Sequence, residues 1–491
     1  MSGYVGDGVF VRSREAFARA EQWLAGAEAA GLELAGLEER LTARGREIAR
    51  LLLQDHLDAR AAAEPRLARV AGPDGITRTW AEAGRTRQLS TVLGPVVMSR
   101  IAYRAAGACR VHPADAQLGL PAGRHSHGLA QMVACESVRG SLAVACAQVT
   151  GRTGCALGTR QAQQLIRQAA CDFDGFYAAR PRPAPGPGQV LVLSCDAKGI
   201  RMRPGELRAE AARKARQAVP KQDGRLSQGE VRTRKRMAET GAVYLITPAP
   251  RTAGDIVGPG PRQPGPKARH KWLTASIAAT AAEVIAAMFA EADRRDPSRE
   301  ATWIALADGN KDQITRIQAQ AAARGHPVTI IIDLIHVTEH LWDAAWCLFP
   351  RASPDAGPWV RAHAAQLLHA GAAGAAAVAA DLRDAAAGLG KARRAIAAKT
   401  AAYLEAKAPY LDYPAALAAG WPISTGVIEG ACRHLIKDRM DITGARWGTD
   451  TAEAILKLRA LLANGDWDPY WDWHLQHEHE RNHPPSHTPA A

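Results

Sequence analysis

The order of apolar and amphipathic segments between residues 189 and 349 limits the fold of this chain more than any other feature. Three short apolar runs come first, and they are followed by helix, strand, helix, strand and helix. Short aliphatic runs predict buried strands, whereas longer segments with a periodic apolar face predict helices. The candidate strands are 189–196, 241–248, 271–278, 301–308 and 326–333, and the candidate helices are 281–295, 312–325 and a segment beginning near 336.

This order predicts an α/β domain with a mixed five-stranded sheet, because it is the order of the RNase H-like fold. The alanine-rich segment 350–420 is predicted to be an all-α insertion, after which 421–475 completes the core that begins at 189–349. The sequence RPRPAPGPG (180–188) predicts a linker between domains. Residues 476–491 are expected to form a flexible tail.

The chain before the linker is predicted to be a mainly helical DNA-binding region. Residues 1–120 combine helical and strand-like segments, and 121–180 contains a helix, a glycine-containing turn and a second helix with Thr159 as a candidate N-cap. This pattern indicates a helix-turn-helix, although an ordinary helical hairpin with a polar face has the same pattern. The candidate DNA-binding residues of the second helix are Arg160, Gln161, Gln164 and Arg167.

The excess of positive charge favours a polyanionic partner, with charge that serves only solubility as the alternative. The 491 residues include 62 Lys+Arg and 49 Asp+Glu, which gives a formal charge of +13. We expect no membrane span, because no apolar run reaches about 18 residues. The N-terminal sequence lacks a signal-peptide pattern, and the eight cysteines include no C-x-x-C pair. A cytoplasmic protein, associated with the nucleoid when bound to DNA, is therefore expected.

Three acidic residues stand where an α/β sheet would bring them together. Asp196 and Asp308 end the first and fourth candidate strands, and Glu429 lies in the first turn of a later helix, after Ser424 or Thr425 as N-cap. We expect the helix dipole to keep Glu429 ionised. Phosphoryl transfer with two metal ions needs converging oxygen ligands, and Mg²⁺ or Mn²⁺ suits such carboxylates. The sequence therefore predicts Asp196, Asp308 and Glu429 as catalytic residues and metal ligands.

Four further residues are predicted to support this site. Asp333 ends the fifth candidate strand and His336 follows it, so Asp333 is an alternative to Asp308 as the second aspartate. Arg433 and Lys437 follow Glu429 by four and eight residues, which places all three on one face of a regular helix.

The sequence His336-Val-Thr-Glu-His340 also has the H-x-x-E-H pattern of inverted zinc metallopeptidases. That interpretation explains neither Asp196 and Asp308 nor the basic segment that follows Asp196.

The segment 201–237 contains twelve Lys/Arg and four Asp/Glu, which is more than half of the excess positive charge of the chain. Such a cluster is expected to bind phosphates without sequence specificity, with Arg234, Lys235 and Arg236 at its end. A solvated basic linker is the alternative.

Several segments resemble the ISKra group of bacterial insertion-sequence transposases. They include SCDAKGIRMRP, LADGN, IIIDLIHVTEHLW and WPISTGVIEGACRHLIKDRM, and the resemblance extends from about residue 95 to 475. These transposases are DDE enzymes, so the resemblance implies metal-dependent DNA cleavage and strand transfer with Asp196, Asp308 and Glu429 as the triad. Asp333-x-x-His336 is similar to the C/D-x-x-H element of several DDE superfamilies. Many DDE enzymes have a basic residue seven positions after the Glu, where this chain has Ile436.

The sequence thus predicts a DNA transposase that acts as a homo-oligomer on element ends and target DNA. Two alternatives stay open, an RNase H-like DNA nuclease and a catalytically inactive DNA-binding relative.

Overall fold

The computed structural model describes residues 8–217, 234–258, 260–261, 263–442 and 444–484. The chain divides into two compact units, the first formed by Met1–Ala179 and Asp466–Ala491 and the second by Arg180–Gly465. The second unit therefore ends before residue 475, where we expected the catalytic core to end. No helix in the described ranges has the length and apolar character that crossing a bilayer requires.

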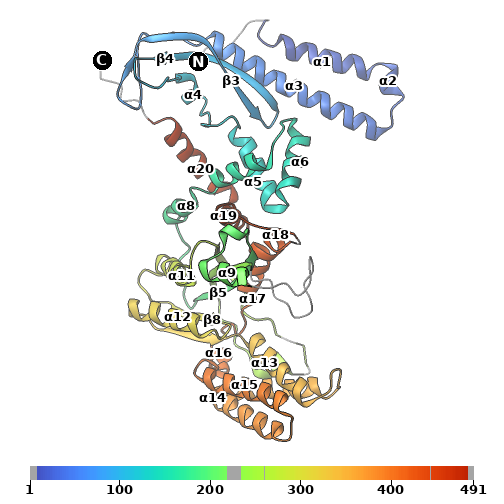
Figure 1. Cartoon of the computed structure of the whole chain (residues 1–491), viewed down its shortest axis with the longest axis vertical. Coiled ribbons are helices and arrows are strands. Elements are labelled where there is room, and N and C mark those ends of the chain that lie inside the picture. Colours follow the sequence, from blue (N-terminus) through green and yellow to red (C-terminus); the bar gives the residue numbers. More distant parts are fainter. Residues whose placement is uncertain (1–7, 218–233, 259, 262, 443, 485–491) are drawn as a thin grey trace. The chain divides into compact units, whose positions relative to one another are not determined.

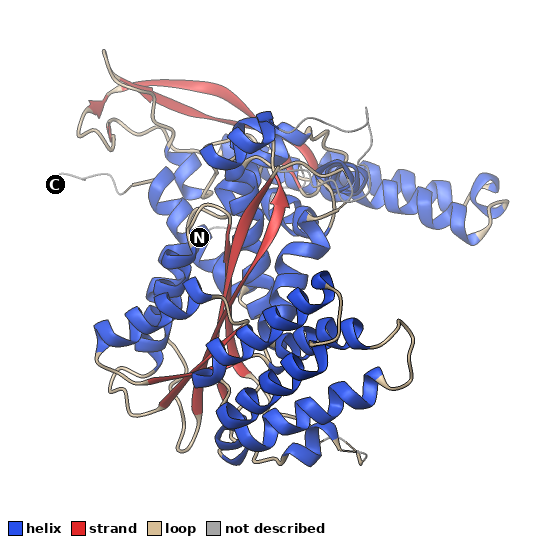
Figure 2. Ribbon diagram, turned by 60° about the horizontal axis from the view of Figure 1, so that its bottom comes forward, coloured by secondary structure: helices blue, strands red, loops and turns tan. Residues whose placement is uncertain are grey.

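The first unit begins with helices and a long antiparallel ribbon of two strands, β3 and β4 (Figures 1 and 2). The long helix α3 packs on β4, where the Gln54 side chain donates to the Val97 carbonyl at 2.6 Å and accepts from its N–H at 2.8 Å. The elements are α1 (Val11–Leu24), α2 (Ala27–Ala30), α3 (Leu34–Ala62), β1 (Val70–Ala71), β2 (Thr77–Arg78), β3 (Trp80–Thr91), β4 (Gly94–Arg104) and α4 (Pro113–Gln117).

Three helices, α5 (His127–Arg139), α6 (Leu142–Thr153) and α7 (Thr159–Ala169), pack around a shared apolar cluster. Gly154 ends α6 in a left-handed conformation, which favours glycine. The N-cap of α7 is Gly158 and not Thr159, because the Gln161 side chain accepts from the Gly158 N–H at 3.0 Å. The predicted order of helix, glycine-containing turn and second helix is therefore present in α6 and α7, but the N-cap of the second helix is Gly158 and not the predicted Thr159.

The C-terminal segment returns to the first unit as α20 (Trp467–Asn482) beside α8 (Phe173–Ala179). The Tyr470 hydroxyl donates to the Ala169 carbonyl at 2.6 Å, and the Tyr177 hydroxyl donates to Asp466 at 2.8 Å. The prediction of a flexible tail from residue 476 was wrong as far as Asn482, because buried aromatic residues fix the helix. Residues 485–491 of that tail lie outside the described residues.

The second unit contains a five-stranded mixed sheet in the order β7-β6-β5-β8-β9. The antiparallel pairs are β5–β6 and β6–β7, and the parallel pairs are β5–β8 and β8–β9. The predicted order of strands and helices is confirmed, although β5 and β6 extend beyond the predicted runs. The elements are β5 (Val190–Arg201), β6 (Lys235–Ile246), β7 (Arg269–Ser276), α11 (Ala281–Arg295), β8 (Thr302–Ala307), α12 (Lys311–Arg324), β9 (Val328–Ile332) and α13 (Leu334–Leu348).

The first residues of the predicted linker (180–188) are fixed to the second unit. The Arg182 side chain is 5% exposed and contacts Glu291 of α11 at 2.6 Å, and Arg295 contacts the same carboxylate at 2.9 Å. Helix α11 also packs on β6, where a side chain at Gly241 would meet Met288 at 2.8 Å.

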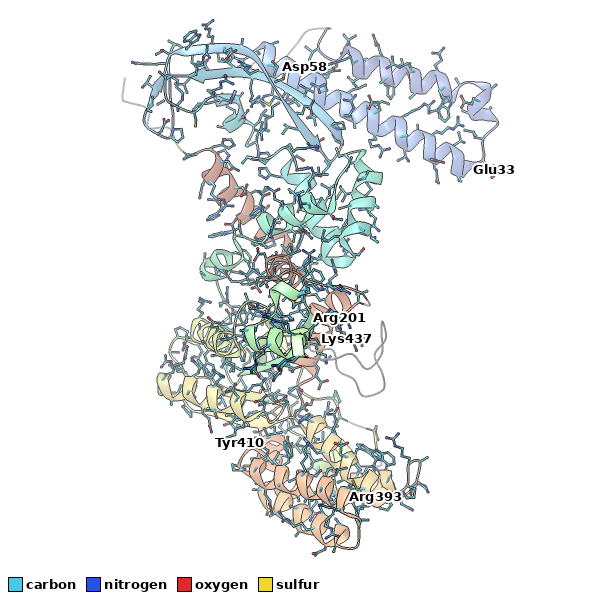
Figure 3. The ribbon with its side chains drawn as sticks, in the orientation of Figure 1. Glu33, Asp58, Arg201, Arg393, Tyr410 and Lys437 are labelled. Atoms are coloured by element: carbon cyan, nitrogen blue, oxygen red, sulfur yellow. The ribbon has the colours of Figure 1, made fainter. Side chains whose placement is uncertain are left out.

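The expected helical insertion is formed mainly by α14 and α15, which pack on each other and on α13 (Figure 1). Gly371 kinks α14 with a φ of 53°, and a side chain there would meet the Leu411 carbonyl at 3.2 Å. Figure 3 labels Arg393 and Tyr410 in this insertion. The elements are α14 (Ala356–Ala386), α15 (Lys391–Lys407), η2 (Ala408–Tyr410) and α16 (Tyr413–Ala418).

The chain then returns to the sheet through α17 (Gly426–Ala431), the π-helix η3 (Cys432–Lys437), α18 (Asp438–Met440) and α19 (Thr449–Asn464). Trp447 fixes the loop before α19 to the end of β5, since its N–H donates to the Arg201 carbonyl at 3.1 Å. The smaller elements η1 (Pro204–Glu206), α9 (Ala209–Gln217) and α10 (Ala253–Val257) lie in the β5–β6 and β6–β7 connections.

Candidate active site

The register of the three parallel strands aligns the predicted aspartates. Ser194 of β5 pairs with Leu306 of β8, and Ala307 of β8 pairs with Ile332 of β9. Continued past these pairs, the same register places Asp196, Asp308 and Asp333 in one row. We expected Asp196 to end its strand, but β5 continues to Arg201 and pairs with β6 along this extension.

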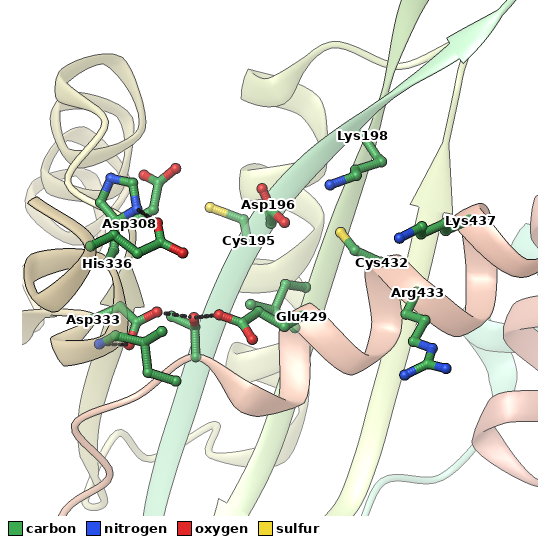
Figure 4. A pocket seen from close by; sticks show the side chains of 14 residues that line it. Cys195, Asp196, Lys198, Asp308, Asp333, His336, Glu429, Cys432, Arg433 and Lys437 are labelled. Carbon is green, nitrogen blue, oxygen red and sulfur yellow. Dashed lines mark hydrogen bonds and ion pairs between the residues drawn. The ribbon is translucent and has the colours of Figure 1, made fainter. Parts of the chain in front are cut away.

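A cavity of about 410 Å³ lies where this row meets α13, α17 and η3 (Figure 4). It brings together the predicted catalytic residues and all four predicted supporting residues. Its lining is Cys195, Asp196, Lys198, Asp308, Asp333, Ile335, His336, Glu339, Thr425, Ile428, Glu429, Cys432, Arg433 and Lys437.

A hydroxyl connects two of the carboxylates. Thr425 donates to Asp333 Oδ2 at 2.6 Å, and the same Oγ1 lies 3.2 Å from Glu429 Oε1. Asp333 is buried and also accepts from the Ile335 N–H at 2.9 Å, which caps α13. Thr425 stands at the N-cap position of α17 but makes no capping bond with its side chain. Sequence reasoning suggested Thr425 only as a cap, and its role as a bridge depends on tertiary contact.

The electrostatic environment of Glu429 differs from our expectation. Partial burial and the neighbouring charges of Asp333 and Asp196 raise the pKa of Glu429 above its usual range. The helix dipole was expected to keep this carboxylate ionised, but burial and the neighbouring carboxylates oppose its charged form. The site therefore concentrates negative charge that a cation would stabilise.

Asp308 and Asp196 are held by neutral donors of the backbone. Asp308 accepts from the Asn310 N–H at 2.8 Å, and Asp196 accepts from the N–H of Ala197 at 2.7 Å. Gly309 has a φ of 93°, and a side chain there would meet the Tyr403 hydroxyl at 2.5 Å. Tyr403 also donates to the Asp308 carbonyl at 3.3 Å. The insertion thus contributes to the site through Tyr403, a residue that the local sequence does not mark.

Lys198, Arg433 and Lys437 place positive charge at one end of the cavity (Figure 4). We expected Arg433 and Lys437 to follow Glu429 on a regular α-helix, but residues 432–437 form a π-helix. A π-turn contains one residue more than an α-turn. Ile436 is consequently fully buried, and Lys437 lines the cavity.

The two cysteines of the cavity are poor candidates for nucleophiles. Burial and the neighbouring carboxylates raise the pKa of Cys195 to about 12, and burial and Asp196 raise the pKa of Cys432 to about 12. Both thiols are therefore protonated near neutral pH, whereas the thiolate is the reactive form.

The residues of the H-x-x-E-H pattern do not converge as a zinc site. The ring of His340 packs on Tyr403 at 4.0 Å between centroids, while His336 Nδ1 lies 3.4 Å from Glu339 Oε2. Among the residues that the structure describes, the potential ligands that lie within 4.8 Å of one another are Cys171, His474 and Glu478 in the first unit. No three ligand atoms of the described residues of the cavity meet this 4.8 Å criterion.

The predicted DNA-binding residues differ in exposure. Arg160, Gln164 and Arg167 are exposed on α7, but Gln161 is engaged with Gly158. Arg234 and Lys235 are exposed at the beginning of β6. The next residue, Arg236, is half-buried and donates to the Ala278 carbonyl at 3.3 Å. Much of the basic segment, 218–233, lies outside the described residues.

A comparison with models of known protein families finds no match to this chain, and a comparison with curated proteins finds none either.

Proposed function

We propose that this chain is a DNA transposase of the DDE type with an RNase H-like core. The observation that carries the proposal is the convergence of Asp196, Asp308 and Glu429 in one cavity, with Lys198 and Lys437 at its end. A scissile phosphodiester needs carboxylate-bound cations and positive side chains around it. The strand order β7-β6-β5-β8-β9 supports the RNase H-like assignment.

The residues of the cavity fit a hard divalent cation such as Mg²⁺ or Mn²⁺. All of the acidic ligands offer oxygen, and burial together with the charges of Asp333 and Asp196 raises the pKa of Glu429, so a cation beside it would stabilise the carboxylate. Asp196, Asp308 and Glu429 would hold the ions. The bound metal would activate the attacking oxygen and stabilise the leaving oxygen of the phosphodiester.

The contacts of the two aspartates favour Asp308 over Asp333 as the second member of the triad. Asp333 is 2% exposed, and both of its carboxylate oxygens accept hydrogen bonds, from Ile335 and Thr425. Asp308 is more exposed and has one such bond from a nearby N–H. In this proposal Asp333 positions Thr425 and through it Glu429, while Asp308 faces the ion.

The π-helix gives Lys437 a defined role. Because η3 contains one residue more per turn, the eighth position after Glu429 takes the place that the seventh has on a regular helix. Lys437 would thus bind a DNA phosphate, and Ile436 belongs to the core. Lys198 and Arg433 would bind the flanking phosphates.

DNA recognition would divide between base contacts and phosphate contacts. The exposed Arg160, Gln164 and Arg167 of α7 would read element ends, and Arg234 and Lys235 would hold phosphates near the site. We further propose that the protein works as a homo-oligomer on DNA in the bacterial cytoplasm.

The direct test is to incubate the protein with labelled DNA from the flanks of its own gene in Mg²⁺ or Mn²⁺, and to map nicks and joined products. Strand cleavage followed by joining of a 3′ end to a second DNA is the expected result. Cleavage without joining would favour a nuclease. Binding that needs no metal, with intact DNA throughout, would favour an inactive DNA-binding relative and contradict the proposal.

A further inference from the structure

We infer that the first unit holds a second metal site, for an ion of the Zn²⁺ class, formed by Cys171, His474 and Glu478. The thiol, imidazole and carboxylate ligand atoms of these residues lie within 4.8 Å of one another. They do not belong to the carboxylate cavity, whose residues come from the other unit. The inference therefore does not depend on the proposed function.

One helix and one short connection carry the ligands. His474 and Glu478 are one turn apart on α20, so their side chains leave the same face of the helix. Cys171 lies in the short connection between α7 and α8. The imidazole is buried, the carboxylate is half-buried and the thiol is exposed, so an ion could enter from the side of Cys171.

A neighbouring carboxylate orients the histidine. Asp172 Oδ2 lies 2.6 Å from His474 Nδ1, which is the arrangement that metal-bound histidines commonly share. Arg481 donates to the same Asp172 Oδ2 at 2.8 Å, so the carboxylate that orients the imidazole is itself held in place.

The charge of the cluster suits a divalent ion. Arg481 contacts Asp172 and Glu478, each at 2.7 Å, and compensates one of their two charges. When Cys171 loses its proton to bind a metal, the four side chains carry a net charge of −2. A divalent cation would neutralise that charge.

The ligand chemistry selects the ion. Sulfur, nitrogen and oxygen together favour Zn²⁺, whereas Mg²⁺ prefers oxygen alone. Three protein ligands would leave one tetrahedral position for water. The ion would tie α20 to the α7–α8 connection, beside the hydrogen bond from Tyr470 to Ala169, and so would hold together segments that are distant in the sequence.

The test uses the full-length protein without an affinity tag, treated with EDTA, dialysed and titrated with Co²⁺ as a spectroscopic substitute for Zn²⁺. We expect one equivalent to produce tetrahedral Co²⁺ bands with a thiolate charge-transfer band. Cys171→Ser should abolish the charge-transfer band, and Glu478→Gln should weaken binding. Asp172→Asn should weaken it by about 10- to 100-fold. Absence of the charge-transfer band in the wild-type protein would overturn the inference.

Two variants separate this site from chance binding. Cys109→Ser removes another exposed thiol, and His479→Gln removes a histidine whose ring lies 5.2 Å from that of His483. Both variants should keep the charge-transfer band, and its loss in either would contradict the assignment. Zn²⁺ should also raise the Tm of the wild-type protein and of His479→Gln. If Cys171→Ser does not fold, Glu478→Gln decides, because an unchanged Co²⁺ affinity in that variant would overturn the site.

Discussion

The carboxylate cavity and the Cys171 cluster (Cys171, Asp172, His474, Glu478 and Arg481) differ in how their negative charge is compensated. In the cluster, a guanidinium contacts both carboxylates at 2.7 Å. In the cavity, Asp196, Asp308 and Asp333 accept hydrogen bonds from neutral N–H and O–H groups. Neutral donors orient a carboxylate without cancelling its charge. The cavity is therefore suited to bind hard cations, and the contacts of the cluster with Arg481 are suited to stabilise the fold.

The largest expected effect comes from the acidic residues of the cavity. We expect Asp196→Asn, Asp308→Asn and Glu429→Gln each to reduce DNA cleavage by on the order of 10³-fold or more, because each removes a ligand from a site that acts as a unit. DNA affinity should change little. Asp384→Asn, an exposed change on α14, is the control. Cleavage by Asp308→Asn at the wild-type rate would move its role to Asp333.

The π-helix offers a pair of neighbouring residues with opposite expectations. Ile436→Ala should lower the free energy of unfolding by about 2–5 kcal/mol, because the side chain is fully buried. Lys437→Ala should leave stability nearly unchanged and slow cleavage by about 10²-fold. Denaturant unfolding and cleavage rates measured on both variants test the division. Equal effects of the two variants on cleavage would contradict it.

The helix α7 should affect recognition and not chemistry. Arg160→Ala and Gln164→Ala should each reduce the preference for element ends over random DNA by about 1–3 kcal/mol, if they contact bases. The rate of cleavage at saturating DNA should stay the same. Competition binding measures the preference, and Gln161→Ala serves as a comparison because its side chain caps the helix. Unchanged discrimination would place end recognition in another segment.

The beginning of β6 tests phosphate binding through salt dependence. Neutralising Arg234 and Lys235 should flatten the log–log slope of affinity against salt by about 0.9 for each lost phosphate contact. Arg236→Gln should flatten it less, because this side chain is half-buried and donates to Ala278. Affinity is measured at several salt concentrations for each variant. An unaltered slope in the double variant would favour the solvated-linker alternative.

The smallest effect concerns Glu429 and pH. Its pKa is raised in the folded protein, so protonation stabilises the fold at low pH, and that stability is lost as pH rises through the folded pKa. In metal-free buffer near pH 7, Glu429→Gln should therefore raise the Tm by on the order of a degree. The difference should disappear near pH 4, where the wild-type residue is protonated. A lower Tm for the variant at neutral pH would contradict the crowding of charge in the cavity.

Much of the second unit follows from local sequence. The apolar runs and amphipathic segments gave the order of five strands and three helices, and α11 was predicted with the bounds it has. Asp308 and Asp333 were found because they follow buried strands directly. The extension of β5 to Arg201 was missed, since residues 197–201 (AKGIR) have no apolar run and no regular alternation, and they form a strand because β6 pairs with them.

The sequence by itself determined which segments form strands and helices, because burial and periodicity are local properties of the chain. It also supplied the acidic and basic residues of the cavity. Only the tertiary structure decided that Thr425 bridges Asp333 and Glu429 and that Tyr403 contacts the turn after β8. It also decided that, in the π-helix, Lys437 lines the cavity and Ile436 is buried. The same holds for Cys171 and His474, which α20 brings together from distant positions. The physical reason is that each of these contacts forms only when particular segments pack against each other, and the local sequence of one segment does not predict which other segment it will contact.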